Sequence, residues 1–323
     1  MTVRNTLSLD REGFYNSRYL HVHWALKSDP ADPNAIVSSL LDVFAGCLPD
    51  EDCVMQAIYK PDKYGPLVEK TAKLSAVASI VRSGADVLSD YLMASSYKNS
   101  RSHANQRNAP KYVLQYIDST QNTSYGAPSP PPHLEVRIDL RYLAQVKDMS
   151  KHNDTKSFLA DLLRPAVLLP GCAFALVDVA ATWVRFAPES PQFYPHLQLT
   201  EWQYAVPWWY YMFSEDRHRK IPFVPWGVYI GPEMHSNLDS LRADFESFDG
   251  SWYAKRGSEV ERYTQWTHTY DNGGVLFCCS QSFGDGYIDG MYWPGDLNGG
   301  LHYRKVIHVA AWLMTRLRRD GIM

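Results

Sequence analysis

The chain has 323 residues, and 45% of them are hydrophobic, which is enough to fill the core of one large domain or of two ordinary ones. Its 35 acidic and 32 basic residues give a formal net charge of −3, without a dominant basic stripe that could neutralise phosphates, so nucleic acid is not expected as a direct partner. No segment approaches the roughly 18 uninterrupted apolar residues of a membrane-spanning helix, and residues 1–20 lack the pattern of a secretory signal. We therefore expect a cytoplasmic protein without membrane contact.

Cysteine and aromatic content refine this expectation. The five cysteines are odd in number and sparse for the length, which is typical of free thiols in a reducing compartment. Aromatic residues make up 13% of the chain, with 10 Trp and 21 Tyr, and they concentrate after Trp183. Large rigid rings stabilise cores and also anchor protein interfaces, so this surplus fits both roles.

The first 127 residues are predicted to form an α/β half. Alternating polarity over Tyr19–Lys27 predicts a strand. The next segment predicts a helix that ends near Gly46 and Pro49, because its apolar residues share one helical face. These residues are Ile36, Leu40, Leu41, Phe44 and Leu48. Residues 67–92 are predicted to be helical in part, most clearly in the segment SGADVLSDYLM (83–93), and Tyr112–Ile117 is predicted to be a strand.

A second half is predicted over residues 128–323. Consecutive prolines within Ser124–His133 exclude regular structure there and indicate a crossing loop or a linker. Leu134–Leu140 then alternates as a strand, and Asn153–Val167 predicts a capped helix with apolar Phe158, Leu159, Leu162 and Leu163. The order of strand, polar loop and helix thus occurs twice, which suggests two related halves, although one compact domain also fits.

The remaining residues continue the alternation of strands and helices. We expect a strand at Cys172–Phe186, an irregular aromatic insertion at Phe193–Trp226, and a strand and helix over residues 227–248 with Leu238, Leu241 and Phe245 on one face. The Asn272-Gly273 pair predicts a turn into another strand, and the chain ends in an amphipathic helix with basic residues in its last turn. The predicted fold class is α/β (α+β), with mixed sheets flanked by helices.

Few residues suggest a metal site. His21 and His23 project to the same face of their strand, but no third ligand pattern accompanies them, so we expect partly exposed sheet histidines. The loop Gly284–Gly300 carries Asp285, Asp289 and Asp296 but lacks the spacing of a calcium loop or a phosphate loop. No metal and no cofactor are therefore predicted.

Catalytic motifs are also missing from the sequence. There is no G-x-S-x-G elbow, and Cys278-Cys279 lies in an apolar strand, where thiols are usually inert. His268 is the best candidate for a general base, but no motif supplies a group to orient it. We expect a protein that is not an enzyme and has no catalytic residue.

Three segments of the chain resemble a family of bacterial immunity proteins. They are residues 19–44 (YLHVHWALKSDPADPNAIVSSLLDVF), residues 223–234 (FVPWGVYIGPEM), and residues 273–283 together with residues 302–323. The matching features are Trp226-Gly227, Gly273-Gly274 and the C-terminal Gly321-Ile322-Met323. The family belongs to polymorphic-toxin and type VI secretion systems. Each member protects against one restriction-endonuclease-like nuclease toxin, in the manner of a toxin–antitoxin pair. The resemblance covers about a third of the chain.

The resemblance implies that the partner is a cognate effector toxin, a nuclease, and that the chain catalyses no reaction. A nuclease has a basic groove and a carboxylate-held divalent metal, so an acidic and aromatic surface can occlude its active site. We expect the Gly284–Gly300 loop to dock on the effector, together with part of the aromatic insertion. The predicted contact residues are Asp285, Tyr287, Asp289, Tyr292, Trp293, Trp208, Trp209, Tyr210 and Tyr211.

Alternatives to this prediction stay open at the level of sequence. Inhibition could act remotely, by blocking motion or dimerisation of the toxin, instead of by occlusion. An enzyme of unrecognised type would place His268, Asp271 and the Gly284–Gly300 loop around one pocket. A structural or interaction protein would use its aromatic surplus in its core or in a permanent interface. No sequence feature indicates an oligomeric state.

Overall fold

The computed structural model describes most of the predicted elements. The described residues are 19–59, 68–83, 88–95, 111–117, 132–139, 155–169, 171–180, 219–222, 224–248, 265–279 and 300–323. The chain forms two compact units, which we call the N-terminal unit (Ser17–Cys172) and the C-terminal unit (Ala173–Met323 with Met1–Asn16).

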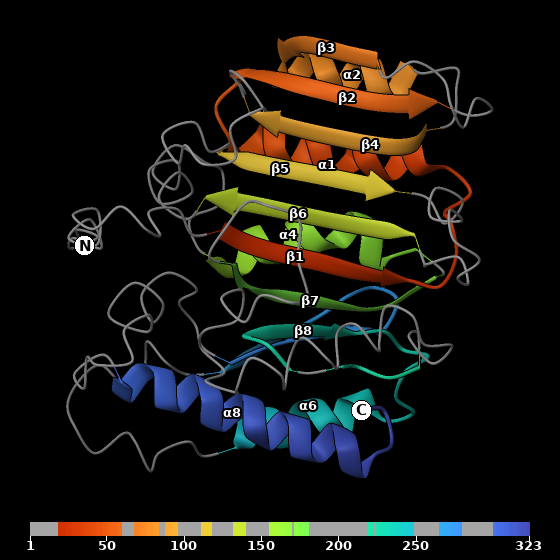
Figure 1. Ribbon diagram of the computed structural model, residues 1–323. Helices are drawn as coiled ribbons and strands as arrows, with labels where there is room; N and C mark the ends of the chain where they lie inside the picture. Colours follow the sequence, from red (N-terminus) through yellow and green to blue (C-terminus); the bar gives the residue numbers. More distant parts are fainter. Residues whose placement is uncertain are drawn as a thin grey trace, which may run out of the picture. The chain divides into compact units, whose positions relative to one another are not determined.

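Six antiparallel strands form the sheet of the N-terminal unit, in the order β3-β2-β4-β5-β6-β1. The strands are β1 (Tyr19–Leu26), β2 (Asp52–Tyr59), β3 (Val68–Lys73), β4 (Leu88–Ser95), β5 (Tyr112–Ile117) and β6 (His133–Asp139). The helices are α1 (Pro33–Cys47), α2 (Leu74–Ser83) and α4 (Thr155–Val167), and all three lie on the same face of the sheet (Figure 1). Helix α1 packs between α2 and α4.

Local signals in the sequence explain helix α1 and its packing. The Asp32 side chain accepts a hydrogen bond from the Ala35 amide at 3.0 Å, and Pro33 occupies the first helical turn, where its missing N–H costs nothing. The five residues predicted to share a face of this helix are all buried. Phe44 meets Tyr112 of β5 edge-to-face, with ring centroids 5.5 Å apart. The helices therefore cover the face of the sheet that carries Tyr112.

Four antiparallel strands form the sheet of the C-terminal unit, in the order β7-β8-β10-β9. They are β7 (Cys172–Ala180), whose first residue is the last of the N-terminal unit, β8 (Gly227–Ile230), β9 (Trp266–Thr269) and β10 (Val275–Cys278). The helices of this unit are α6 (Leu238–Ser247) and α8 (Gly300–Arg319). The predicted Asn-Gly turn joins β9 to β10: Gly273 has a φ of 84°, and the Asn272 side chain accepts a hydrogen bond from the Gly274 amide at 3.0 Å.

The predicted α+β fold class is confirmed. The helices expected after residue 33, within 153–167 and at the C-terminus are present, as are the strands at the start of the chain and at residues 112–117 and 134–140. The helix predicted in the segment 83–93 was wrong, because Leu88–Ser95 is strand β4, which pairs with β2 on one side and β5 on the other. Pairing on both sides outweighs a helical pattern in a short apolar run.

The division between the units differs from the predicted boundary between residues 127 and 128. Strands β5 and β6 pair directly across that boundary, from Tyr112 opposite Ile138 to Ile117 opposite His133. The N-terminal unit consequently extends to Cys172 and includes α4. None of the described helices has the length and apolar character needed to cross a membrane.

The burial of the cysteine thiols leads to a prediction about their reactivity toward alkylating reagents. Burial, and secondarily the nearby Asp50 and Asp52, raise the pKa of the Cys53 thiol to about 12, and burial also raises the pKa of Cys172. A thiol in an unfolded chain has a pKa of about 8.5 and reacts as the thiolate. We expect iodoacetamide at pH 8 to leave Cys53 and Cys172 unlabelled in the native chain and to label both in urea, as measured by peptide mass spectrometry. Rapid labelling of Cys53 without denaturant would contradict this.

Candidate functional site

The predicted partner-contact residues fall outside the described part of the chain. This applies to Asp285, Tyr287, Asp289, Tyr292 and Trp293 of the loop, and to Trp208, Trp209, Tyr210 and Tyr211 of the insertion. The loop ends at Gly300, where α8 begins. Their contacts with a partner therefore remain a prediction.

The two sheet histidines of β1 are buried and not partly exposed as predicted. Their relative exposures are 3% for His21 and 5% for His23. His21 lies opposite Arg137 of β6, and its Nε2 atom is 3.2 Å from the Glu135 carboxylate, to which Arg137 also forms an ion pair. The expectation failed because the neighbouring strand supplies polar partners that let imidazole rings enter the interior. Among the described residues, no group of three or more His, Cys, Asp or Glu could hold a metal ion.

His268, the candidate base of the alternative enzyme hypothesis, lies on β9 opposite Leu276. Its ring meets Tyr270 edge-on, with centroids 4.7 Å apart. Asp271 follows in the exposed turn between β9 and β10. The third component of that hypothesis, the Gly284–Gly300 loop, lies outside the described residues.

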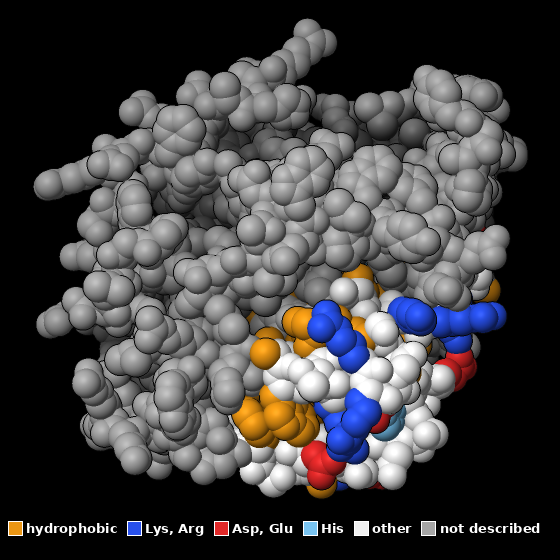
Figure 2. All heavy atoms as spheres, turned by 60° about the horizontal axis from the view of Figure 1, so that its bottom comes forward, with side chains coloured by type: hydrophobic (Ala, Val, Ile, Leu, Met, Phe, Trp, Pro, Cys, Tyr) orange, Lys and Arg blue, Asp and Glu red, His pale blue; other side chains and the backbone are white. Residues whose placement is uncertain are grey.

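A cleft along α8, bordered by Phe248 just beyond the end of α6, is the candidate functional site on the described surface. Its volume is about 390 Å³, and we call it the α6–α8 cleft. On this face of the C-terminal unit, basic side chains lie beside exposed hydrophobic ones (Figure 2). The lining residues are Phe248, Ala311, Trp312, Thr315, Arg316 and Arg319.

The cleft arises because α8 carries two side-chain stripes. One stripe is fully buried and packs in the core; it consists of Val309, Ala310, Leu313 and Leu317. The second contains Ala311, Trp312, Thr315, Arg316 and Arg319, whose spacings of three, four, seven and eight residues place them on a neighbouring face of the helix. Trp312 stacks on Phe248, just beyond the end of α6, with centroids 5.1 Å apart and planes 28° apart. This stacked pair forms the aromatic wall of the cleft.

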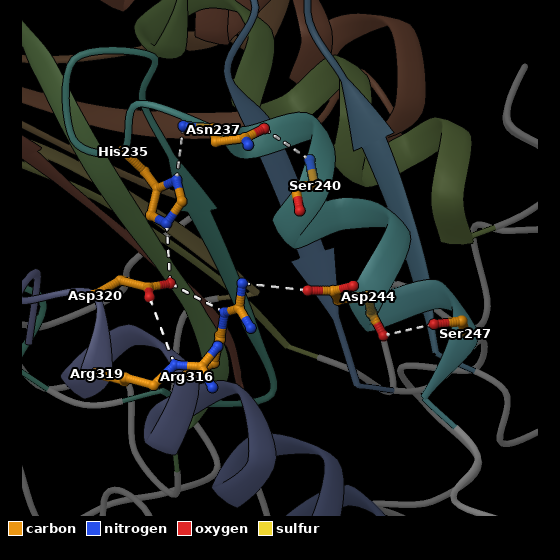
Figure 3. Close-up of polar contacts among 8 residues, drawn as sticks. All are labelled: His235, Asn237, Ser240, Asp244, Ser247, Arg316, Arg319 and Asp320. Atoms are coloured by element: carbon orange, nitrogen blue, oxygen red, sulfur yellow. Dashed lines mark hydrogen bonds and ion pairs between the residues drawn. The ribbon is translucent and has the colours of Figure 1, made fainter.

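A network of charged side chains fixes Arg316 at the edge of the cleft (Figure 3). The guanidinium of Arg316 donates to the Asp320 carboxylate at 3.1 Å and pairs with Asp244 of α6 at 3.2 Å. His235, in the segment between β8 and α6, is 3.0 Å from the same Asp320 oxygen. Arg316 and Asp320 also border a second, polar pocket of about 520 Å³. The network therefore joins three segments of the C-terminal unit around one arginine.

Both ring nitrogens of His235 form hydrogen bonds in this arrangement. Its Nδ1 atom accepts a hydrogen bond from the Asn237 amide at 3.0 Å, which assigns the proton to Nε2. The Nε2–H group then donates to Asp320 at 3.0 Å. The His235–Asp320 pair consequently connects the segment before α6 to the C-terminal end of α8.

The chemistry of the cleft suits recognition of another protein. Tryptophan and arginine are the residues that most often dominate binding energy at interfaces. The Arg319 side chain is 66% exposed and reaches Asp320 only at 3.9 Å, so it can pair with a new carboxylate. Sequence reasoning missed the cleft because it assigned the basic last turn of α8 only to the helix dipole. The signal that could have found it is the second stripe of side chains beside the buried one.

Backbone hydrogen bonds bring together parts of the C-terminal unit that are distant in sequence. The carbonyl of Trp226 accepts a hydrogen bond from the Cys279 amide at 2.9 Å, which joins residues 223–234 to residues 273–283. The Ile322 carbonyl accepts from the Ile221 amide at 2.8 Å, and the chain turns after α8 at Gly321, with a φ of 78°. The tail Gly321-Ile322-Met323 is thus fixed next to the entry to β8.

Comparisons with known proteins give one structural similarity. No protein-family model matches the chain, and no curated protein matches it. A solved structure, the Pseudomonas aeruginosa T6SS protein PA0821, aligns over 95% of this chain and 81% of its own with 13% sequence identity and a TM-score of 0.49. At this identity and TM-score, the similarity says nothing about a partner or an activity.

Proposed function

We propose that the chain is an immunity protein that binds and neutralises a cognate antibacterial effector. The observation that carries the proposal is the α6–α8 cleft, where the stacked pair of Trp312 and Phe248 lies beside Arg316 and Arg319. Such a surface suits a tight protein contact, since a few desolvated aromatic and arginine anchors supply most of the affinity of an interface. The resemblance of residues 223–234, 273–283 and 302–323 to the immunity family supports the same function.

We further propose that the effector is a nuclease and that the chain occludes its active site. The acidic and aromatic loop of residues 284–300 leads directly into α8, whose last turns line the cleft. Asp285 and Asp289 would face the basic groove of the nuclease, with Tyr287, Tyr292 and Trp293 as anchors. In this account the chain inhibits a reaction and catalyses none.

A survival assay tests the function. The product of the adjacent gene is expressed in a naive bacterial host with and without this chain, and the two proteins are co-purified. We expect toxicity without the chain, rescue with it, and a complex that stays together during purification. Toxicity without rescue and without a complex would overturn the proposal.

A variant of the Gly284–Gly300 loop tests whether the loop contacts the effector or only connects two parts of the chain. Asp285, Asp289 and Trp293 are replaced together by Ala, and folding is checked by circular dichroism. If the loop contacts the effector, the triple variant binds it more weakly and rescues less growth. An unchanged affinity in a folded triple variant would make the loop a connector only, and inhibition would have to come from elsewhere on the chain.

A further inference from the structure

We infer that the α6–α8 cleft receives an acidic segment of the effector that carries a large apolar side chain. This inference rests on the proposed function and names the chemistry of one contact. It differs from the contact predicted for the loop, which is acidic itself and would face a basic groove. The effector would then meet this chain through two contacts of opposite charge.

The shape of the cleft sets the size of what it can hold. Its volume of about 390 Å³ lies at the lower end of the roughly 300–1,000 Å³ found for ligand pockets, so it accommodates a few side chains and not a whole element. Phe248 and Trp312 offer an aromatic wall, and Ala311 and Thr315 are small residues that leave room next to it. A single large apolar side chain fits this space and would pack against the half-buried ring of Trp312.

The charges at the cleft favour a carboxylate of the effector next to its apolar side chain. Arg316 is held by Asp244 and Asp320, so its orientation is fixed before binding. Arg319 is mostly exposed and only loosely paired, and a guanidinium matches the planar geometry of a carboxylate. Because Arg319 loses little by leaving Asp320, a new pair forms at low desolvation cost.

The same charges disfavour nucleic acid as the occupant. The carboxylates of Asp244 and Asp320 lie within the arginine network, and the α6 residue Glu246 is exposed nearby in sequence. A polyanion places several phosphates close together and would meet these carboxylates as well as the arginines. One or two carboxylates on a folded protein surface can pair with Arg319 and avoid them.

A pair of variants at Ala311 tests the charge of the occupant with little effect on packing. Ala311 is exposed on the cleft stripe of α8, and Glu and Lys are similar in size and in helix propensity. We expect Ala311→Glu to weaken binding of the purified effector, measured by titration calorimetry, at least about tenfold more than Ala311→Lys does. Equal weakening by both would overturn the inference, because it would show a steric effect without a preference for acidic groups.

Substitution of the anchors tests the cleft itself. We expect Trp312→Ala to weaken effector binding by about 30-fold or more and Arg319→Glu by about tenfold or more. The control is Arg82→Glu on α2, another exposed arginine in an ion pair, with Asp42, and this variant should bind within about twofold of the wild-type chain. Thermal melts confirm that each variant is folded.

The outcomes distinguish this inference from the function on which it rests. If the wild-type chain binds the effector and the folded Trp312, Arg319 and Ala311 variants bind within about twofold of it, the cleft is not the contact, and the immunity function stands. If one Asp→Lys or Glu→Lys substitution in the effector restores its binding to the Arg319→Glu variant of this chain, the substituted position identifies the acidic segment. If the wild-type chain does not bind the effector at all, the proposed function itself fails.

Discussion

Replacing Glu135 by Ala is expected to lower the free energy of unfolding by about 3–5 kcal/mol. The Glu135 carboxylate contacts both the buried Arg137 guanidinium and the buried His21 imidazole. Replacement by Ala removes this ion pair from the buried Arg137 guanidinium, and breaking a buried pair by removing one partner is strongly destabilising. Urea denaturation of the full chain, followed by circular dichroism, measures the loss.

One further variant separates charge from packing at this cluster, and a variant at an exposed ion pair of α4 serves as a control. Glu135→Gln keeps the shape of the side chain and its hydrogen-bonding oxygen, so we expect a smaller loss than for Glu135→Ala. Asp161→Ala is the exposed comparison: Asp161 pairs with Arg164 at 4.0 Å on the surface of α4, and its removal should cost less than about 0.5 kcal/mol. A loss below about 1 kcal/mol for Glu135→Ala would mean that water reaches the cluster.

Replacing Phe245 by Ala is expected to destabilise the C-terminal unit by about 3–5 kcal/mol. The Phe245 ring is fully buried on α6. It meets Phe277 of β10 edge-to-face at 5.3 Å and lies 6.0 Å from the ring of Trp312 of α8, so it connects the helix pair to the sheet. Truncation to Ala removes these contacts and leaves a cavity beneath the cleft.

The matched control is Phe245→Leu, which keeps an apolar side chain at the site and should cost about 1–1.5 kcal/mol. Both variants are compared by urea denaturation with the wild-type chain. Because Phe245 supports Trp312, we also expect Phe245→Ala to bind the effector more weakly than Phe245→Leu. A stability change within about 0.5 kcal/mol for Phe245→Ala would contradict the packing described for α6 and α8.

Local sequence patterns predicted the elements whose signals are long and clear. Helix α1 has a capping aspartate and a proline at its start, and its apolar stripe is buried. The turn before β10 followed from the Asn272-Gly273 pair, because only a few residues adopt a positive φ easily. In these places the local preference and the tertiary structure agree.

Other elements depend on partners that are distant in the sequence. No element was predicted at β2, β3 lies within the residues predicted to be helical in part, and β4 showed an apolar run that also fits a helix. Their pairing with one another and with β5 stabilises them as strands, which short-range reasoning does not capture. The burial of His21 has the same origin, since Glu135 and Arg137 come from a strand more than 100 residues away.

The α6–α8 cleft could be predicted only in part. The stripe with Trp312, Arg316 and Arg319 is visible in the sequence of α8 as a helical spacing. Its aromatic partner Phe248 and the carboxylate of Asp244 come from another helix and its end, and nothing local indicates that they meet it. The position of the site therefore needed the tertiary structure, whereas its residue types did not.

The most direct measurement is a titration of the effector's nuclease activity with the purified chain. Cleavage of plasmid DNA by the purified product of the adjacent gene is followed while the chain is added up to a severalfold excess. We predict that cleavage falls in proportion to the added chain and stops near equimolar amounts, and that the Ala311→Glu variant requires more protein than Ala311→Lys. Full nuclease activity at a severalfold excess of the folded wild-type chain would contradict the proposed immunity function.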